Sequence, residues 1–353
     1  MSTAGKIAAD FAAELESIGE RTGTALTQLA RLAPPPRGAT TNEVVYQEDQ
    51  LKLRYYGQGS DSHATPLLVV YSLVNRPYIL DLKPERSLIR SLRDAGHAVY
   101  LIDWGEPEAA HRFLNLDDYI DGYIRRCVER IRRRHDCAKI DLLGVCQGGT
   151  LGLCFAALYP QRVAKLINLV TPVDFHAGDG TLQQLTRHLD LDAVIDSVGN
   201  VPSQLLNGFF VSLKPYRLLS QRYLELANLA NDAQGLADFL QLEQWMYDSP
   251  SLAGEACRQF AQECYQANKL VRGELEIAGQ PIRLQALTMP ICNVYATADH
   301  LVPPESARAL QTYIINANYE EVEFAGGHLS VFISGRAQRQ LFPQLAAWLR
   351  RSP

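Results

Sequence analysis

A cysteine in a glycine-rich turn is the residue in this sequence whose surroundings most favour chemistry. The apolar run 140–144 leads directly into the segment Gly144-Val-Cys146-Gln-Gly148, and a helix-forming stretch begins at Thr150. Gly-x-Cys-x-Gly between a strand and a helix is the pattern of a nucleophile elbow with cysteine in place of serine. The positive end of the helix would favour a thiolate at Cys146. We predict that Cys146 is a nucleophile; a structural cysteine in a tight turn is the alternative.

A nucleophile in this pattern needs a carboxylate and a histidine, which follow it along the chain in that order. Asp299 follows the predicted strand 292–296, and His328 follows the predicted strand 322–324 in a Gly-Gly-His sequence. His328 would accept the proton of Cys146, while Asp299 would fix the imidazole tautomer and stabilise its charged form. A single histidine is more often structural, but this context favours a catalytic triad of Cys146, Asp299 and His328.

Acyl transfer also needs hydrogen-bond donors for an oxyanion. The backbone N–H of Gln147, directly after Cys146, is expected to point into the same space as the thiol. A second donor should come from the loop 72–77, which follows the apolar strand 67–71. Within that loop we expect the N–H of Val74 to be the donor.

The elements around these residues predict an α/β fold. Short apolar runs, typical of strands buried in a sheet, alternate with segments of helical periodicity. Strands are expected at residues 43–47, 51–56, 67–71, 97–103, 140–144, 165–170, 292–296 and 322–324. Helices are expected at residues 87–95, 116–134, 150–159 and 306–314. This alternation predicts a mostly parallel sheet with helices on both faces, which binds its ligand where the strands end.

Two segments depart from this alternation. Residues 5–32 carry apolar side chains at helical spacing and are followed by three prolines, which predicts an amphipathic helix that stops there. That helix either packs on its own chain or docks on another protein or a lipid-like surface. Residues 175–280 lose the strand signal, which indicates a cap inserted over the edge of the sheet. The predicted organisation is a helix and proline-rich linker at 1–40, a core at 41–174 and 281–353, and a cap subdomain at 175–280.

Composition excludes several classes of protein. The chain has 353 residues, 47% of them hydrophobic and 21% charged, which are globular rather than disordered or fibrous values. The net charge of −5 argues against nucleic-acid binding, which favours a basic face. Seven cysteines without a CxxC pair indicate neither a disulfide framework nor a zinc site, and no motif indicates a metal or organic cofactor. The N-terminus lacks the pattern of a signal peptide, so we expect a cytoplasmic protein.

The same segments resemble polyhydroxyalkanoate synthase catalytic subunits, and the short class III type most closely. The resemblance extends from about Asn42 to the C-terminus. The matching segments are 70–81, Tyr100–Gly105, Gly144–Gly149, Thr171–Phe175, Asp299–Pro304 and Gly326–His328. It implies the α/β-hydrolase fold with an inserted cap, and it assigns the triad to Cys146, Asp299 and His328.

The resemblance also implies an activity. The family polymerises (R)-3-hydroxyacyl-CoA thioesters, here expected to be 3-hydroxybutyryl-CoA, into a polyester and releases coenzyme A. The coenzyme A thioester is thus a substrate, and no cofactor is implied. The polymer accumulates as cytoplasmic granules, so the growing chain and the granule surface are expected partners. A homodimer and a second, largely helical subunit of the PhaE type are implied for class III, whereas class IV enzymes of similar length use another partner. Water competes with the hydroxyl acceptor, so we expect a cap that excludes water and opens for coenzyme A.

Two other readings remain open. A cysteine-dependent α/β hydrolase of a small ester or lactone, resembling dienelactone hydrolases, would share the elbow and the triad. The long insertion and the additional motifs argue against it. A non-catalytic granule-coating subunit on a hydrolase fold is the second alternative, and the intact triad argues against that one.

Overall fold

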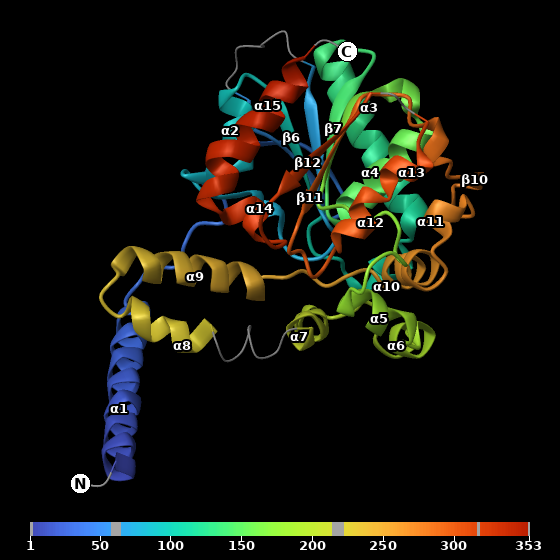
Figure 1. Cartoon of the computed structure of the whole chain (residues 1–353). Coiled ribbons are helices and arrows are strands. Elements are labelled where there is room, and N and C mark those ends of the chain that lie inside the picture. The colour runs from blue at the N-terminus through green and yellow to red at the C-terminus, as the bar shows by residue number, and fades with distance from the viewer. Residues whose placement is uncertain (1–2, 58–64, 214–221, 316–317, 352–353) are drawn as a thin grey trace. The chain divides into compact units, whose positions relative to one another are not determined.

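The structure is a computed structural model that describes residues 3–57, 65–213, 222–315 and 318–351 (Figure 1). Packing divides the chain into two compact units. One, here called the sheet unit, consists of Gly38–Ser203 and Pro250–Pro353. The other, the helical unit, consists of Met1–Arg37 and Gln204–Ser249. Each unit is built around its own apolar contacts.

An eight-stranded sheet forms the centre of the sheet unit. Its strands, in spatial order, are β1 (Glu43–Glu48), β2 (Leu51–Tyr55), β6 (Val99–Asp103), β3 (Leu67–Val70), β7 (Ile140–Val145), β8 (Val163–Leu169), β11 (Ile291–Ala296) and β12 (Tyr319–Phe324). The strands from β6 to β12 are parallel to their neighbours, and β1 and β2 add an antiparallel edge. Every side chain of β3, β7 and β11 is buried, as their apolar sequences predict.

Helices cover both faces of this sheet. In Figure 1, α2 (Leu88–Asp94) and α15 (Phe342–Arg350) lie on one side, and α3 (Arg125–His135) and α4 (Gln147–Leu158) lie on the other. The unit also contains the α-helices α5 (Thr181–Arg187), α6 (Leu191–Val198), α10 (Gly254–Gln259), α11 (Lys269–Arg272), α12 (Pro304–Arg308), α13 (Leu310–Tyr313) and α14 (Ser330–Ile333). Two small hairpins pair β4 (Asp81–Lys83) with β5 (Arg86–Ser87) and β9 (Glu276–Ile277) with β10 (Gln280–Pro281). The predicted α/β class, with a mostly parallel sheet between helices, is confirmed.

The predicted elements are present with shifted ends. The helix expected at 116–134 begins with a π-helical turn, Asp118–Ile124, before it continues as α3. The helix expected at 306–314 is two short helices, α12 and α13. The helix α4 begins at Gln147, three residues before the expected 150, with Cys146 at its N-cap position. These ends depend on local hydrogen bonding that periodicity does not encode.

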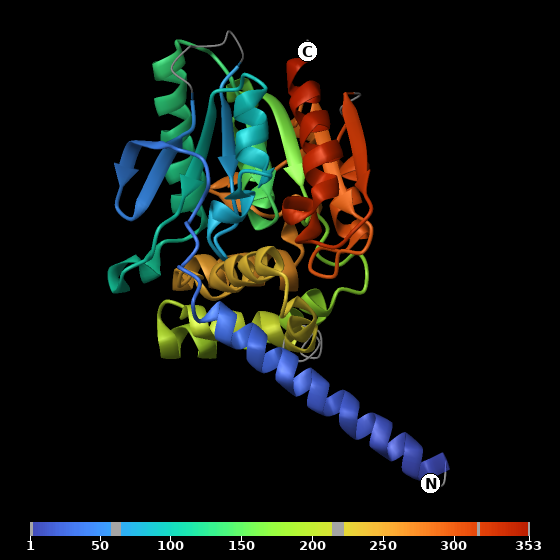
Figure 2. The ribbon, with the colours of Figure 1, turned by 90° about the vertical axis from the view of Figure 1, so that its left-hand side faces the viewer.

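The helical unit contains α1 (Thr3–Leu29), α7 (Ser203–Ser212), α8 (Arg222–Leu226) and α9 (Ala233–Tyr247). Figure 2 shows α1 as one long helix. The core of this unit consists of the buried side chains Ala25, Leu226, Ala230 and Leu236, with Leu29, Leu32, Leu229 and Phe239 packed against them. Gln28 adds a hydrogen bond of 2.8 Å to the Ala230 carbonyl. The predicted amphipathic helix therefore packs on its own chain through its C-terminal part.

The predicted cap, 175–280, is distributed over both units. Residues 204–249 belong to the helical unit, while the flanking segments 175–203 and 250–280 belong to the sheet unit. An antiparallel bridge between Val201 and Leu252 joins the two flanking segments. Residues 214–221 of the predicted cap lie outside the described residues. The sequence could not show this division, because the core of the helical unit is shared between α1 and residues 226–239, which lie far apart in the chain. The role of 175–280 as a cap stays a prediction.

No described helix combines the length and the apolar character that crossing a membrane requires.

Candidate active site

Cys146 occupies a strained turn between β7 and α4. Its backbone has φ 53° and ψ −127°, a region that residues with a side chain seldom adopt. The N–H of Cys146 donates to the Leu169 carbonyl at 2.9 Å, and its own carbonyl accepts from Gly149 N–H at 2.9 Å. The end of β8 and the first turn of α4 therefore hold the turn from both sides, as expected for a nucleophile elbow.

Three glycines make this turn possible. A Cβ atom at Gly144 would overlap the Gly149 backbone, and one at Gly148 would overlap the backbone of Tyr71 at the end of β3. A Cβ at Gly149 would overlap the Thr171 side chain. The helix α4 thus starts in backbone-to-backbone contact with its neighbours, which is why the Gly-x-Cys-x-Gly spacing is needed.

Asp299 and His328 lie in a buried pair. His328 Nδ1 lies 2.7 Å from Asp299 Oδ2, and each residue is only 6% exposed. The other carboxylate oxygen, Oδ1, accepts the N–H groups of Leu301 and Val302 at 2.9 Å each. A carboxylate held in this way accepts the Nδ1–H of the ring, so Nε2 is the ring nitrogen available for a proton from Cys146.

Cys146 lies close enough to that histidine for its charge to act on the ring. Burial acts to lower the pKa of His328, but the charges of Asp299 and Cys146, together with hydrogen bonds to both residues, raise it well above its ordinary value. The three predicted triad residues, which come from distant parts of the sequence, are therefore brought together. This arrangement is compatible with His328 acting as the base for a cysteine nucleophile, a role that stays a prediction.

The surroundings of Cys146 are aromatic and apolar. The cysteine packs against Tyr295, Val302 and Ala307. Burial, and then the charge of Cys146, raises the pKa of Tyr71 and of Tyr265 well above the ordinary value of tyrosine.

The expected oxyanion donors lie on the two segments that the sequence indicated. Gln147 is the first residue of α4, directly after Cys146. The N–H of Val74, in the loop after β3, donates to Ser72 Oγ at 3.1 Å. The role of both N–H groups as oxyanion donors stays a prediction.

Sequence reasoning missed how the loop is attached to the elbow. The side-chain oxygen of Gln147, Oε1, accepts the Leu73 N–H at 3.1 Å and the Ser72 hydroxyl at 3.2 Å. All three of these residues are buried. A polar side chain directly after the nucleophile was the available signal, but its partners are about 75 residues away and cannot be found from spacing.

The loop after β3 is also supported from β6. The Trp104 indole N–H donates to the Tyr71 carbonyl at 2.9 Å, and Arg76 donates to the Gly105 carbonyl at 2.9 Å. The end of the matching segment Tyr100–Gly105 thus supports the loop beside the site.

The other six cysteines have thiols whose pKa is raised by burial. All seven cysteines are free thiols. Burial raises the pKa of each of the other six, to about 12 for Cys154 and Cys292 and to about 11 for Cys257. These thiols remain protonated near neutral pH and are poor nucleophiles.

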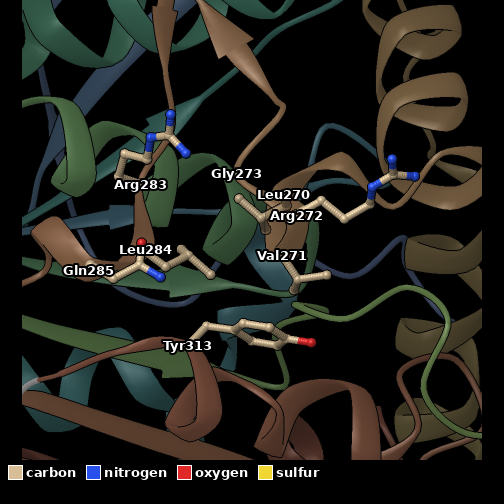
Figure 3. A pocket seen from close by; sticks show the side chains of 8 residues that line it. All are labelled: Leu270, Val271, Arg272, Gly273, Arg283, Leu284, Gln285 and Tyr313. Atoms are coloured by element: carbon tan, nitrogen blue, oxygen red, sulfur yellow. The ribbon is translucent and has the colours of Figure 1, made fainter.

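A small cavity of about 60 Å³ lies elsewhere in the sheet unit (Figure 3). Its walls are formed by Leu270–Gly273, Arg283–Gln285 and Tyr313. No triad residue lines it. Within the described part of the chain, no group of three or more His, Cys, Asp or Glu side chains could hold a metal ion.

Comparisons with known proteins agree with this geometry. A family model described as the alpha/beta hydrolase fold matches residues 65–334, and one described as the N-terminus of poly-beta-hydroxybutyrate polymerase (PhaC) matches residues 37–92. Among solved structures, a monoacylglycerol lipase from Paleococcus ferrophilus is similar with a TM-score of 0.51 at 16% identity, over 85% of this chain and 98% of that one. An esterase from Thermogutta terrifontis is similar with a TM-score of 0.52 at 17% identity, over 88% and 98%. These two establish the fold alone.

Sequence relatives are much closer. The poly(3-hydroxyalkanoate) polymerase subunit PhaC of Allochromatium vinosum is 41% identical over 95% of this chain and 96% of its own length. The protein of the same name from a Synechocystis species is 44% identical over 88% of this chain and 85% of its own length. With identity of this level over nearly the whole of both sequences, the chain belongs to the family of poly(3-hydroxyalkanoate) polymerase PhaC subunits, built on the α/β-hydrolase fold.

Proposed function

We propose that this protein polymerises (R)-3-hydroxyacyl-CoA thioesters, such as 3-hydroxybutyryl-CoA, into a polyester through a covalent thioester on Cys146. The observation that carries the proposal is a cysteine at a nucleophile elbow, next to a buried His328–Asp299 pair, in a member of a polymerase family. The family relationship supports the reaction. The geometry supports the residue roles.

The first step loads the acyl group. His328 Nε2 accepts the thiol proton of Cys146, and the thiolate attacks the carbonyl carbon of the CoA thioester. The carbonyl oxygen becomes an oxyanion, which backbone N–H groups near Gln147 stabilise. When the intermediate collapses, the bond to the CoA sulfur breaks and His328 returns the proton to that sulfur. One thioester is exchanged for another, so the step is nearly thermoneutral and the acyl group stays activated.

The second step forms the ester bond. The 3-hydroxyl of another hydroxyacyl unit attacks the acyl carbon on Cys146, and His328 accepts the hydroxyl proton. The carbon–sulfur bond breaks, and the proton passes to Cys146 Sγ. A thioester is replaced by a more stable oxoester, which drives the step. Asp299 stabilises the imidazolium that forms in both steps.

Water must be kept from the acyl-enzyme for this sequence to give polymer. The aromatic and apolar side chains that surround Cys146 support such exclusion. We propose that residues 175–280 act as the cap that completes it and that opens for coenzyme A and for the chain.

The setting of the reaction is also proposed. We infer a cytoplasmic enzyme at the surface of polyester granules, acting as a homodimer with a second helical subunit of the PhaE type and without metal or organic cofactor. The name of the relatives, polymerase subunit, supports a multi-subunit enzyme.

Incubation with 3-hydroxybutyryl-CoA tests the proposal, with and without a candidate second subunit. We expect release of coenzyme A together with insoluble polyester. Release of coenzyme A with stoichiometric free 3-hydroxybutyrate would instead identify a hydrolase, and no release in either condition would contradict the proposed activity.

A further inference from the structure

The side chain of Gln147 links the two segments that must together form an oxyanion hole. Its backbone N–H begins α4, beside the nucleophile, while its side-chain oxygen binds the loop after β3. Gln147 is only 9% exposed, so its hydrogen bonds are shielded from water. A buried side chain with these partners fixes the distance between elbow and loop.

The directions of these hydrogen bonds are determined by chemistry. Backbone N–H groups can only donate, so the Leu73 N–H requires the oxygen of the Gln147 amide, not its nitrogen, to face the loop. In the same way, Ser72 Oγ must accept the hydrogen bond from the Val74 N–H. The hydroxyl proton of Ser72 is then available to be donated to Gln147 Oε1. The result is a directed chain from Val74 through Ser72 to Gln147.

We propose that Gln147 and Ser72 are positioning residues that hold the loop donors, above all the Val74 N–H, in register with the thiolate of Cys146. This inference rests on the proposed function. An oxyanion hole requires donors placed within a few tenths of an ångström of the developing charge. The charged oxyanion is a stronger acceptor than the neutral Ser72 hydroxyl. During the reaction the Val74 N–H can therefore exchange its hydrogen bond to Ser72 for one to the oxyanion.

The variant Gln147→Met tests this role, since methionine has a similar size but no comparable acceptor. Loss of one oxyanion donor costs about 10²- to 10³-fold in kcat, so a misplaced donor should cost about 10- to 100-fold. We expect that fall in the single-turnover rate of CoA release from 3-hydroxybutyryl-CoA, with KM changed less than about twofold because binding contacts remain.

A second reaction separates positioning from a general structural effect. Alkylation of Cys146 by iodoacetamide requires the thiolate but no oxyanion hole. Its rate and pH profile should therefore stay as in the wild type in Gln147→Met. A parallel loss of alkylation and acylation would overturn the proposal, as would an unchanged acylation rate.

Gln338→Met is a matched control. Gln338 also accepts a backbone N–H, that of Ser87 at 2.9 Å, and its amide donates to a serine hydroxyl, that of Ser91 at 2.9 Å. It has no part in the triad or the loop. We expect acylation to be unchanged in this variant, so a loss equal to that of Gln147→Met would contradict a specific role.

Variants of Ser72 provide an independent test of the same proposal. Ser72→Ala should lower acylation and Ser72→Thr, which keeps the hydroxyl, should restore it. Because both side chains belong to one hydrogen-bonded chain, the acylation rate of the double variant with Gln147→Met should be little lower than that of the worse single variant. Additive losses would overturn the proposal.

An acyl donor without coenzyme A, p-nitrophenyl butyrate, provides the same comparisons if 3-hydroxybutyryl-CoA is not turned over. Failure of the proposed function is thus distinguished from failure of this inference.

Discussion

The charge of Asp299 governs the behaviour of His328. Asp299→Asn would keep an acceptor for the Leu301 and Val302 N–H groups, but its amide nitrogen would face His328 Nδ1 and force the wrong tautomer. We therefore expect kcat for acyl transfer to fall about 10³- to 10⁴-fold while the fold is retained. Steady-state kinetics with 3-hydroxybutyryl-CoA measures this, and a loss of only a few-fold would mean that another carboxylate supports His328.

The raised pKa of His328 also predicts that the stability of the fold depends on pH. In the folded protein the pKa of His328 lies well above its ordinary value of about 6.5. A raised pKa stabilises the fold fully below the unfolded value and loses this contribution as the pH rises through the folded value. The advantage of the wild type over Asp299→Asn in the free energy of unfolding should therefore shrink as the pH rises from 6 to 9.

Urea unfolding at several pH values in that range provides the test. In a His328→Gln background, the effect of Asp299→Asn should not change with pH over the range. A difference that is the same at every pH with His328 present would contradict the charge coupling.

The residues of the triad could be found from sequence for a local reason. Each lies within four residues of the end of a strand, and the glycines two residues before and after Cys146 have the spacing of a tight turn. The contacts of Gln147 with Ser72 and Leu73 could not be found, because they depend on the conformation of one side chain and on the pairing of β3 with β7. Whether Val74 donates to an oxyanion is a question of the same kind.

At the level of elements, the contact of α4 with β3 depends on Gly148. A Cβ there would overlap the Tyr71 backbone, which cannot move without disturbing β3. We expect Gly148→Ala to destabilise the protein by about 1–3 kcal/mol or more, as overpacking does. Thermal or urea unfolding of the purified variant measures the loss.

Gly208→Ala is the control for this change. Gly208 lies within α7, and a Cβ there would meet nothing within 4 Å. Alanine favours helix over glycine, so this variant should be as stable as the wild type or more so. Equal destabilisation by the two substitutions would show that the close approach at Gly148 is not the cause.

Most strands were predictable because burial on both faces requires continuous apolar runs, as in β3 and β7. The ends of helices were less predictable from the sequence. The break between α12 and α13 at Ala309 and the π-helical turn before α3 reflect local hydrogen bonding within otherwise helical patterns.

At the level of the whole molecule, the two units have separate cores and should respond separately to core mutations. Leu236→Ala removes a fully buried side chain from the core of the helical unit. Such a truncation costs about 2–5 kcal/mol in the unit that contains it. Amide hydrogen exchange should speed up in α9 and in the C-terminal part of α1, with little change in β7.

Leu224→Ala serves as the comparison, because Leu224 lies in α8 of the same unit and is 56% exposed. It should leave the exchange rates almost unchanged. Faster exchange of β7 together with α9 in Leu236→Ala would mean that the two units unfold as one. Sequence could not predict this division, since residues 1–37 and 204–249 come together only through long-range packing.

Locating the acyl group tests the proposed covalent mechanism. The enzyme is mixed with 3-hydroxybutyryl-CoA, quenched in acid within a turnover and digested, and the peptides are analysed by mass spectrometry. We predict a 3-hydroxybutyryl mass on the Cys146 peptide and on no peptide with another cysteine, with loss of both acylation and polymer in Cys146→Ala and neither loss in Cys257→Ala. Acylation at another cysteine, or polymer formation by Cys146→Ala, would contradict a covalent thioester on Cys146.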